Sequence, residues 1–205
     1  METKRIEAFS DGVFAVAITL LVLNLQPPPH TTDHLWRALL REWPSYAAFV
    51  VSFFVIGIIW VNHHGVFRNI AQADRILMFI NLVLLFLVVL LPFCTALLAD
   101  NLRRNVNNID SQIAAAIYSS TMLAMSIAFQ GLWRWVVKDG RLLHQHIDAT
   151  QARAASRRFG LGLVVYAGTI VLAFISAPVC LLVHFLIAMY YVFDQLPVGG
   201  RRVTS

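Results

Sequence analysis

The stretch from Ile76 to Ala99 reads ILMFINLVLLFLVVLLPFCTALLA and contains no charged residue. Its 24 residues exceed the roughly 20 that cross a bilayer as an α-helix. A second apolar run, AAFVVSFFVIGIIW, covers residues 47–60, and the whole chain is 59% hydrophobic and 13% charged. A soluble domain averages about 25% charged residues, so this chain cannot cover itself with a polar surface. Neither run alternates as barrel strands do, which predicts an all-α, polytopic membrane protein in the lipid bilayer.

Outward from that stretch, the hydropathy predicts six transmembrane helices in a single domain, residues 1–205. They cover approximately residues 7–25, 44–64, 76–100, 112–137, 159–176 and 179–193. Between the first two spans lie three prolines and the segment HLWRALLREW (residues 34–43), which we expect to form a short interfacial helix. The last two spans are joined by little more than Ala177 and Pro178. The proline and the length of the apolar run favour a hairpin of two short helices there.

The distribution of basic residues predicts the orientation of these spans. If the N-terminus is cytoplasmic, 12 of the 16 Lys and Arg residues lie on the cytoplasmic side. The remaining four, on the outside, are Arg37, Arg41, Arg103 and Arg104. This asymmetry follows the positive-inside rule, so we expect both termini in the cytoplasm. We expect the protein to lie in the plasma membrane. The net charge of +5 then reflects topology and requires no nucleic-acid partner.

The first span is unusual because charged residues stand at its start. Residues 12–25 carry no charge, yet Arg5, Glu7 and Asp11 precede them directly. Lys4 and Arg5 followed by an apolar run resemble a secretory signal peptide. However, no small-x-small cleavage site follows, because the sequence there is LNLQPPP. A helix extended back through the polar residues reaches membrane length, so we expect a retained first span.

Polar side chains within the spans are costly in lipid, so each is a functional candidate. They are Ser10, Asp11, Asn62, His63, His64, Asn81, Ser126, Gln130, His184 and Asp194. In one interpretation, Ser10 and Asp11 hydrogen-bond to Asn62, His63 or His64 and join the first two spans. In the other, the same groups form a proton relay or an ion site. The residue types favour the structural network but leave both interpretations open.

Other chemistry finds little support in the sequence. There is no glycine-rich phosphate loop, no HExxH motif and no Cys/His cluster with metal-ligand spacing. The chain also lacks a TVGYG-type stretch, which would form a carbonyl selectivity filter. Cys94 and Cys180 both lie in predicted spans, where buried thiols are expected. We therefore expect no cofactor, no resident metal and no enzymatic activity.

The start of the first span resembles a known signature. Arg5, Phe9, Ser10 and Asp11 form the pattern RxxxFSD, which is similar to that of the transmembrane protein 175 family. Members of this family are the endolysosomal potassium channels and their prokaryotic relatives. The similarity continues through GVFAVAITLLVLNL (residues 12–25) and includes WVNHH (residues 60–64) in the second span. Six spans and about 200 residues resemble the single-repeat prokaryotic form.

The resemblance implies a homotetramer that passes potassium ions through a central pore lined by the first helix of each copy. It places the constriction at Val16, a selectivity role at Thr19 and further pore-lining positions at Leu20 and Leu23. It also makes the FSD segment a brace beside the pore rather than the filter. Many relatives carry Ile or Leu at the constriction, and a ring of the smaller Val16 could leave the closed gate leakier.

The helical spacing of these residues agrees with that implication. Val16, Thr19 or Leu20, and Leu23 recur at i, i+3 or i+4, and i+7, which places them on one helical face. Four such faces around an axis would form a stack of apolar rings and one ring of hydroxyl groups. Apolar rings can gate a pore by dewetting, and a hydroxyl ring can replace part of an ion's hydration shell. Without the resemblance, such a stripe more often faces lipid or packs in a core.

Two other classes of function remain open. A proton-coupled or cation secondary transporter would use Asp11 and His63 or His64 as coupling groups. Such proteins usually have more spans and an internal repeat, and the sequence shows neither. A membrane enzyme would need a convergent catalytic set. Asp11, His63 and His64 have no nucleophile beside them in a recognisable motif.

Overall fold

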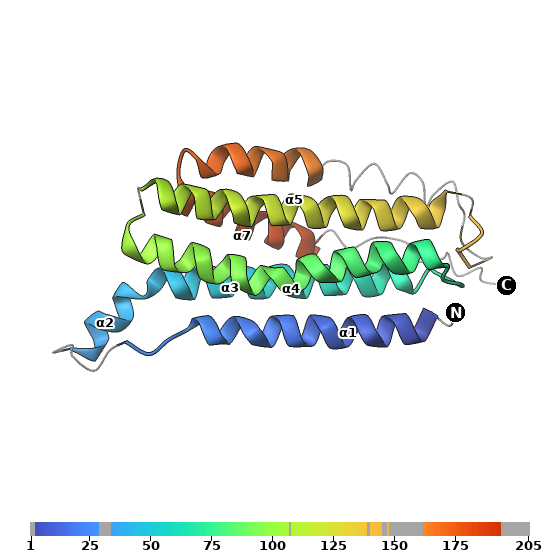
Figure 1. Ribbon diagram of the computed structural model, residues 1–205, viewed down its shortest axis with the longest axis horizontal. Helices are drawn as coiled ribbons and strands as arrows, with labels where there is room; N and C mark the ends of the chain where they lie inside the picture. The colour runs from blue at the N-terminus through green and yellow to red at the C-terminus, as the bar shows by residue number, and fades with distance from the viewer. Residues whose placement is uncertain are drawn as a thin grey trace.

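Long helices run side by side in the computed structural model of the chain (Figure 1). The structure describes residues 3–28, 34–106, 108–138, 140–144, 147 and 162–193. Within these residues, four helical segments are long and apolar enough to cross a membrane. They are α1 (Thr3–Leu20) with its continuation η1 (Leu21–Asn24), α3 (Trp43–Phe67), α4 (Arg75–Arg104) and α5 (Ile109–Val137). The prediction of an all-helical membrane protein is therefore confirmed.

Three described helices are shorter. They are α2 (Leu35–Arg41), the helix over Gly162–Ala173, and α7 (Ala177–Phe193). The last two fall within the predicted fifth and sixth spans, but each has fewer than the roughly 20 residues of a full crossing. Residues 159–161 and Asp194 lie outside the described part of the chain. The count of six spans thus stays a prediction.

The helix ends differ from the predicted bounds for identifiable reasons. α1 begins at Thr3, four residues before the predicted start, so the charged first turns are helical. It tightens into a 3₁₀ turn at Leu21 and ends at Asn24. α4 continues to Arg104, because Arg103 and Arg104 each place a guanidinium nitrogen 2.9 Å from a carboxylate oxygen of Asp100. Charge pairs one turn apart stabilise such a helix end.

Local chemistry defines the starts of the two longest helices. Asp74 caps α4, because its Oδ1 atom accepts a 2.8 Å hydrogen bond from the Leu77 N–H. Asn108 caps α5 in the same way, through a 2.8 Å bond from the Ser111 N–H. Each cap satisfies one of the backbone donors that a helix leaves free at its N-terminus.

α1 lies along one edge of the bundle, against α3 and α4 (Figure 1). α4 packs extensively on α5, and α7 packs on α3. A buried hydroxyl cluster joins the three central helices, since Thr95 on α4 donates to Ser52 on α3 (2.7 Å) and Ser52 bonds Tyr118 on α5 (3.1 Å). Because these polar groups satisfy one another away from water, they can remain in the core at little cost.

Two loops meet at the end of the bundle where α1 begins. Ile70, between α3 and α4, forms an antiparallel bridge with Leu143, which follows α5. Two backbone hydrogen bonds support it, Ala71 N–H to Leu142 O (2.8 Å) and His144 N–H to Asn69 O (3.1 Å). The Thr3 hydroxyl donates to the Ala71 carbonyl (3.3 Å), which links the start of α1 to these loops.

Asp74 connects the same loops electrostatically. Its carboxylate accepts from the Trp135 indole N–H (3.1 Å) and lies 2.9 Å from the Arg141 guanidinium. Partial burial by itself raises the pKa of Asp74, but the Leu77 and Trp135 hydrogen bonds and the Arg141 charge outweigh it. The net effect is a pKa below the ordinary value of an aspartate.

Candidate functional site

α1 divides into a packed face and an exposed face. Its packed residues recur every three or four positions, and they are Ile6, Ser10, Phe14, Ala17 and Leu21. Phe14 is 2% exposed and Ala17 is fully buried, whereas Val16 is 57% and Leu23 is 68% exposed. A helix with a strict 3.6-residue period naturally separates these two sets. The exposed set does not belong to the buried core of a single copy of the described chain.

The four predicted pore residues all lie on the exposed face. Val16, Thr19, Leu20 and Leu23 are each exposed, and none packs in the core of the single chain; their pore-lining role stays a prediction. Phe9 and Arg5 continue the same side toward the start of the helix and are also exposed.

Thr19 forms a local hydrogen bond. Its hydroxyl donates to the backbone carbonyls of Ala15 (3.0 Å) and Val16 (2.9 Å), one turn back along the helix. This bond is common for Thr in membrane helices. It uses the hydroxyl hydrogen but leaves lone pairs on Oγ1, so the oxygen can still accept a hydrogen bond or coordinate a cation.

A buried chain of hydrogen bonds attaches the packed face of α1 to two neighbouring helices. The Ser10 hydroxyl donates to the Ile6 carbonyl (2.8 Å) and accepts from Asn81 Nδ2 on α4 (3.0 Å). Asn81 Oδ1 in turn lies 2.8 Å from Nε2 of His63 on α3. All three residues are buried, so α1, α3 and α4 meet through satisfied polar groups.

The direction of each bond follows from the donors available. Asn81 donates through Nδ2 to Ser10, so its Oδ1 can only accept, and His63 must carry its hydrogen on Nε2. His63 Nδ1 is buried and has no hydrogen-bond partner in the described chain. The ring stacks on Phe67, with centroids 4.3 Å apart, and lies 5.3 Å from Phe14. Apolar walls around an unpartnered Nδ1 suit the neutral imidazole, because a buried charge there would be uncompensated.

A second set of contacts lies beside the buried chain. The Trp60 indole N–H donates to Asp11 Oδ1 over 2.8 Å. One helical turn away, toward the start of α1 and the end of α3, His64 Nδ1 lies 2.7 Å from Glu7 Oε1. This contact lacks the alignment of a hydrogen bond. The predicted partners of Asp11 were Asn62, His63 or His64, and that prediction is wrong, because the partner is Trp60.

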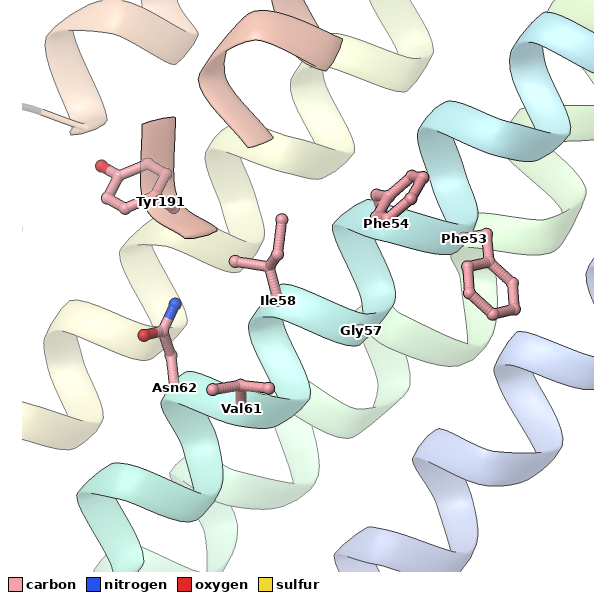
Figure 2. A pocket seen from close by; sticks show the side chains of 7 residues that line it. All are labelled: Phe53, Phe54, Gly57, Ile58, Val61, Asn62 and Tyr191. Carbon is pink, nitrogen blue, oxygen red and sulfur yellow. The ribbon is translucent and has the colours of Figure 1, made fainter. Parts of the chain in front are cut away.

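Asn62 is directed away from α1 altogether. It lines an apolar groove between α3 and α7, shown in Figure 2, whose walls are Phe53, Phe54, Gly57, Ile58, Val61, Asn62 and Tyr191. The sequence prediction grouped Asn62 with its neighbours His63 and His64. However, residues one or two positions apart point in different directions from a helix, so the three side chains cannot share one partner.

The sequence interpretation missed three contributors to this site: Glu7, Trp60 and Asn81. Asn81 was recognised as polar within a span but was not assigned to the network. The pairs Glu7 with Asp11 and Trp60 with His64 are each four residues apart. Two such pairs on facing helices form a ladder with one-turn steps, and this spacing is the signal that could have identified them.

A separate polar cluster lies further from α1. Cys180 contacts the Ser119 hydroxyl (3.3 Å), and His184 Nδ1 lies 2.8 Å from the Cys180 carbonyl. Cys94 contacts the Thr121 hydroxyl (3.4 Å). Both cysteines are free and buried, as predicted. In the part of the chain that the structure describes, no group of three or more His, Cys, Asp or Glu side chains could hold a metal ion.

Comparison with known proteins identifies this arrangement. Residues 5–92, from α1 to the middle of α4, match the family model described as "Endosomal/lysosomal potassium channel TMEM175". A potassium channel of Streptomyces collinus is 51% identical over 205 residues, which are 100% of this chain and 98% of that protein. The chain belongs to the TMEM175 family.

Two further TMEM175-type comparisons cover nearly the whole chain. A potassium channel of Chamaesiphon minutus is 42% identical over 193 residues, 93% of each protein. The crystal structure of a lysosomal potassium-selective channel TMEM175 homologue from Chamaesiphon minutus superposes with a TM-score of 0.81 at 39% identity. It covers 93% of this chain and 96% of that one. The fold of this TMEM175-family member is therefore that of the solved homologue.

The region matched by the TMEM175 model contains the polar side chains that attach α1 to α3 and α4. Ser10, Asp11, Trp60, His63 and Asn81 all lie within residues 5–92. The Ser119–Cys180–His184 cluster lies beyond that region. In this TMEM175-family chain, the residues that match the family model thus include the exposed face of α1 and the buried side chains that attach α1 to α3 and α4.

Proposed function

We propose that this TMEM175-family protein is a potassium channel that conducts the ion passively through a pore. The observation that carries the proposal is the 51% identity, over the full length of this chain, to a protein named as a potassium channel. The exposed side of α1 and η1 supports it, because five large apolar side chains are exposed on the segment with the family signature: Phe9, Val16, Leu20, Val22 and Leu23. An unpartnered face on such a helix fits a surface that other copies complete.

In the proposed assembly, four copies form a homotetramer with α1 at its centre. Val16, Leu20 and Leu23 then form apolar rings around the axis, and Val16 is the constriction. Apolar rings close a pore by excluding water, so a small widening opens it. Thr19 adds a ring of hydroxyl oxygens whose hydrogens bond back to the helix. Their lone pairs can replace part of the hydration shell of potassium.

The buried hydrogen bonds of Ser10, Asn81 and His63 act as a brace in this proposal, together with the Asp11–Trp60 bond. They hold the packed face of α1 against α3 and α4, which leaves the opposite face for the pore. The charged start of α1 is consistent with this role, because Asp11 accepts from Trp60 rather than facing lipid unpaired.

We further propose six spans with both termini in the cytoplasm and the protein in the plasma membrane. The excess of Lys and Arg on one side supports the orientation. The two helices Gly162–Ala173 and α7 are apolar and would complete the count as short spans. They pack against longer helices, and such packing accommodates spans that are short for the bilayer.

A proton-coupled or cation transporter is the alternative function. It would use Asp11 and His63 or His64 as coupling groups, and the observation that favours it is the unpartnered, buried Nδ1 atom of His63. A carrier turns over far too slowly to give resolvable unitary steps. Recording purified protein in planar bilayers therefore separates the two: stepwise potassium currents are expected for the channel, and saturable flux without steps would contradict it.

A further inference from the structure

The short helix α2 has two exposed surfaces of different chemistry, and neither contributes to the proposed pore. Its apolar surface consists of Leu35, Trp36 and Leu40, with the half-buried Leu39 between them. Leu35 is 64% and Trp36 is 70% exposed. At about 100° per residue, these four side chains occupy an arc of about 140° around the helix. Such a large exposed apolar surface on a seven-residue helix is costly in water.

The opposite surface of α2 is cationic. Arg37 and Arg41 lie four residues apart, so they share one face, and both are exposed. Within the described residues, neither forms an ion pair. Arg103 differs, because it lies 3.3 Å from Glu42 and 2.9 Å from Asp100. Glu42 and Asp100 are thus paired with arginines other than Arg37 and Arg41, which leaves these two available for another anion.

The position of α2 relates both surfaces to the membrane boundary. α2 projects at the end of the bundle where α3 begins and α4 ends (Figure 1). The charged cluster of Glu42, Asp100, Arg103 and Arg104 lies at that end and cannot enter hydrocarbon without a large cost. Trp43, exposed at the start of α3, lies at the same level. Tryptophan is the residue that most often marks the interface between acyl chains and headgroups.

We propose that α2 lies in the bilayer interface and binds the phosphate groups of anionic phospholipids. Leu35, Trp36 and Leu40 enter the upper acyl region, while Arg37 and Arg41 contact the headgroups. A helix with one apolar and one basic face lies in the plane of the interface for these reasons, with its apolar face roughly 5–10 Å below the headgroups. An anionic phospholipid matches both surfaces of α2. Its acyl chains suit the apolar surface, and its phosphate complements the two unpaired guanidinium groups that border that surface.

The depth of α2 can be measured in the full-length protein with spin labels. Trp36→Cys, Leu40→Cys and Arg37→Cys variants are labelled singly in bilayers of phosphatidylglycerol; Cys94 and Cys180 are buried. At positions 36 and 40, we expect greater accessibility to oxygen than to a water-soluble nickel chelate, and the reverse at position 37. Equal or greater access of the chelate at all three positions would overturn the proposal. So would exclusion of both reagents, which would indicate a protein partner.

The headgroup contact is tested by charge removal. In the Leu40→Cys protein, we expect Arg37→Gln with Arg41→Gln to move the label toward water. The ratio of chelate accessibility to oxygen accessibility should rise by about fivefold for each arginine removed, at low ionic strength. Arg37→Lys with Arg41→Lys should retain the depth. Arg68→Gln, at the other end of α3, removes an exposed charge and should leave the label unchanged. If wild type shows the same depth in phosphatidylcholine and in phosphatidylglycerol, the anionic-lipid contact is refuted.

Discussion

His63 on α3 and Asn81 on α4 share a 2.8 Å hydrogen bond beneath the first helix. Asn81 extends the connection to Ser10 on α1, so a single amide joins three helices. This bond requires a hydrogen on His63 Nε2, and the His63 ring lies between Phe14 and Phe67. The buried attachment of α1 therefore depends most on Asn81, whose side chain donates one hydrogen bond and accepts the other.

Replacing Asn81 should destabilise the protein through this attachment. Asn81→Leu removes the acceptor of His63 and leaves its buried N–H unpaired, which costs about 1–3 kcal/mol. We expect a lower thermal midpoint in detergent and a smaller fraction of assembled protein by size-exclusion chromatography. Asn62→Leu is the matched control, because Asn62 lines the α3–α7 groove and forms no hydrogen bond in the described structure. Equal losses for both variants would show that the Asn81 contacts do not attach α1.

The Asp11–Trp60 bond should behave as a coupled pair. Asp11→Ala and Trp60→Phe each remove the same 2.8 Å hydrogen bond, so the double variant should lose less than the sum of the single losses. We expect a coupling free energy of about 1 kcal/mol, because the pair is partly exposed. Asp11→Asn retains an acceptor oxygen and should lose little stability. Additive losses in a thermal-unfolding cycle would mean that the two side chains act separately.

Much of this fold follows from hydropathy, but the partner of Asp11 does not. Long apolar runs such as Ile76–Ala99 predict spans because lipid demands them, and the 3.6-residue period separates Val16 from Phe14. In contrast, a shift of one helical turn between α1 and α3 would exchange Trp60 for His64 opposite Asp11. That register depends on packing between helices, which sequence spacing does not specify. Asn62 could have been excluded, since it lies about 200° around the helix from Trp60.

The end of α1 shows the same limit. The stretch from Leu20 to Leu25 is apolar apart from Asn24, so the sequence predicted a first span that continues to Leu25. The structure instead tightens into a 3₁₀ turn at Leu21. Asn24, within this turn, donates a 3.1 Å hydrogen bond to the Pro92 carbonyl in the interior of α4. A tertiary contact 68 residues away along the chain thus accompanies the local geometry, and no local pattern reports it.

Asp74 should make stability depend on pH. Its pKa is lower in the folded protein than in the unfolded chain, where it is about 3.9. The stabilisation is therefore fully present above that value and is lost as the pH falls through the lower, folded pKa. Asp74→Asn should reduce the thermal midpoint near pH 7, and the difference from wild type should shrink in acid. Asp110→Asn, at an exposed site in the first turn of α5, is the control. A difference that grows in acid would contradict the assignment.

Thr19 should influence selectivity through its oxygen. Thr19→Val keeps the shape but removes the lone pairs, so the preference for potassium over sodium should fall while the apolar rings persist. Thr19→Ser keeps the hydroxyl and should retain the preference. Bi-ionic reversal potentials in planar bilayers measure both variants against wild type. If Thr19→Val matches wild type, the hydroxyl serves only its bonds to Ala15 and Val16.

The central claim is that potassium passes through a pore lined by the exposed face of α1. The most direct test is the potassium/sodium reversal potential of reconstituted wild type and Val16→Asn, recorded with the basal current. Wild type should reverse toward the potassium equilibrium potential. Val16→Asn places amides in the narrowest ring, so it should wet more easily, carry a larger basal current and reverse closer to zero. Val22→Asn, on another side of the same segment, serves as the control. If Val16→Asn and wild type agree in both current and reversal potential, α1 does not line the pore.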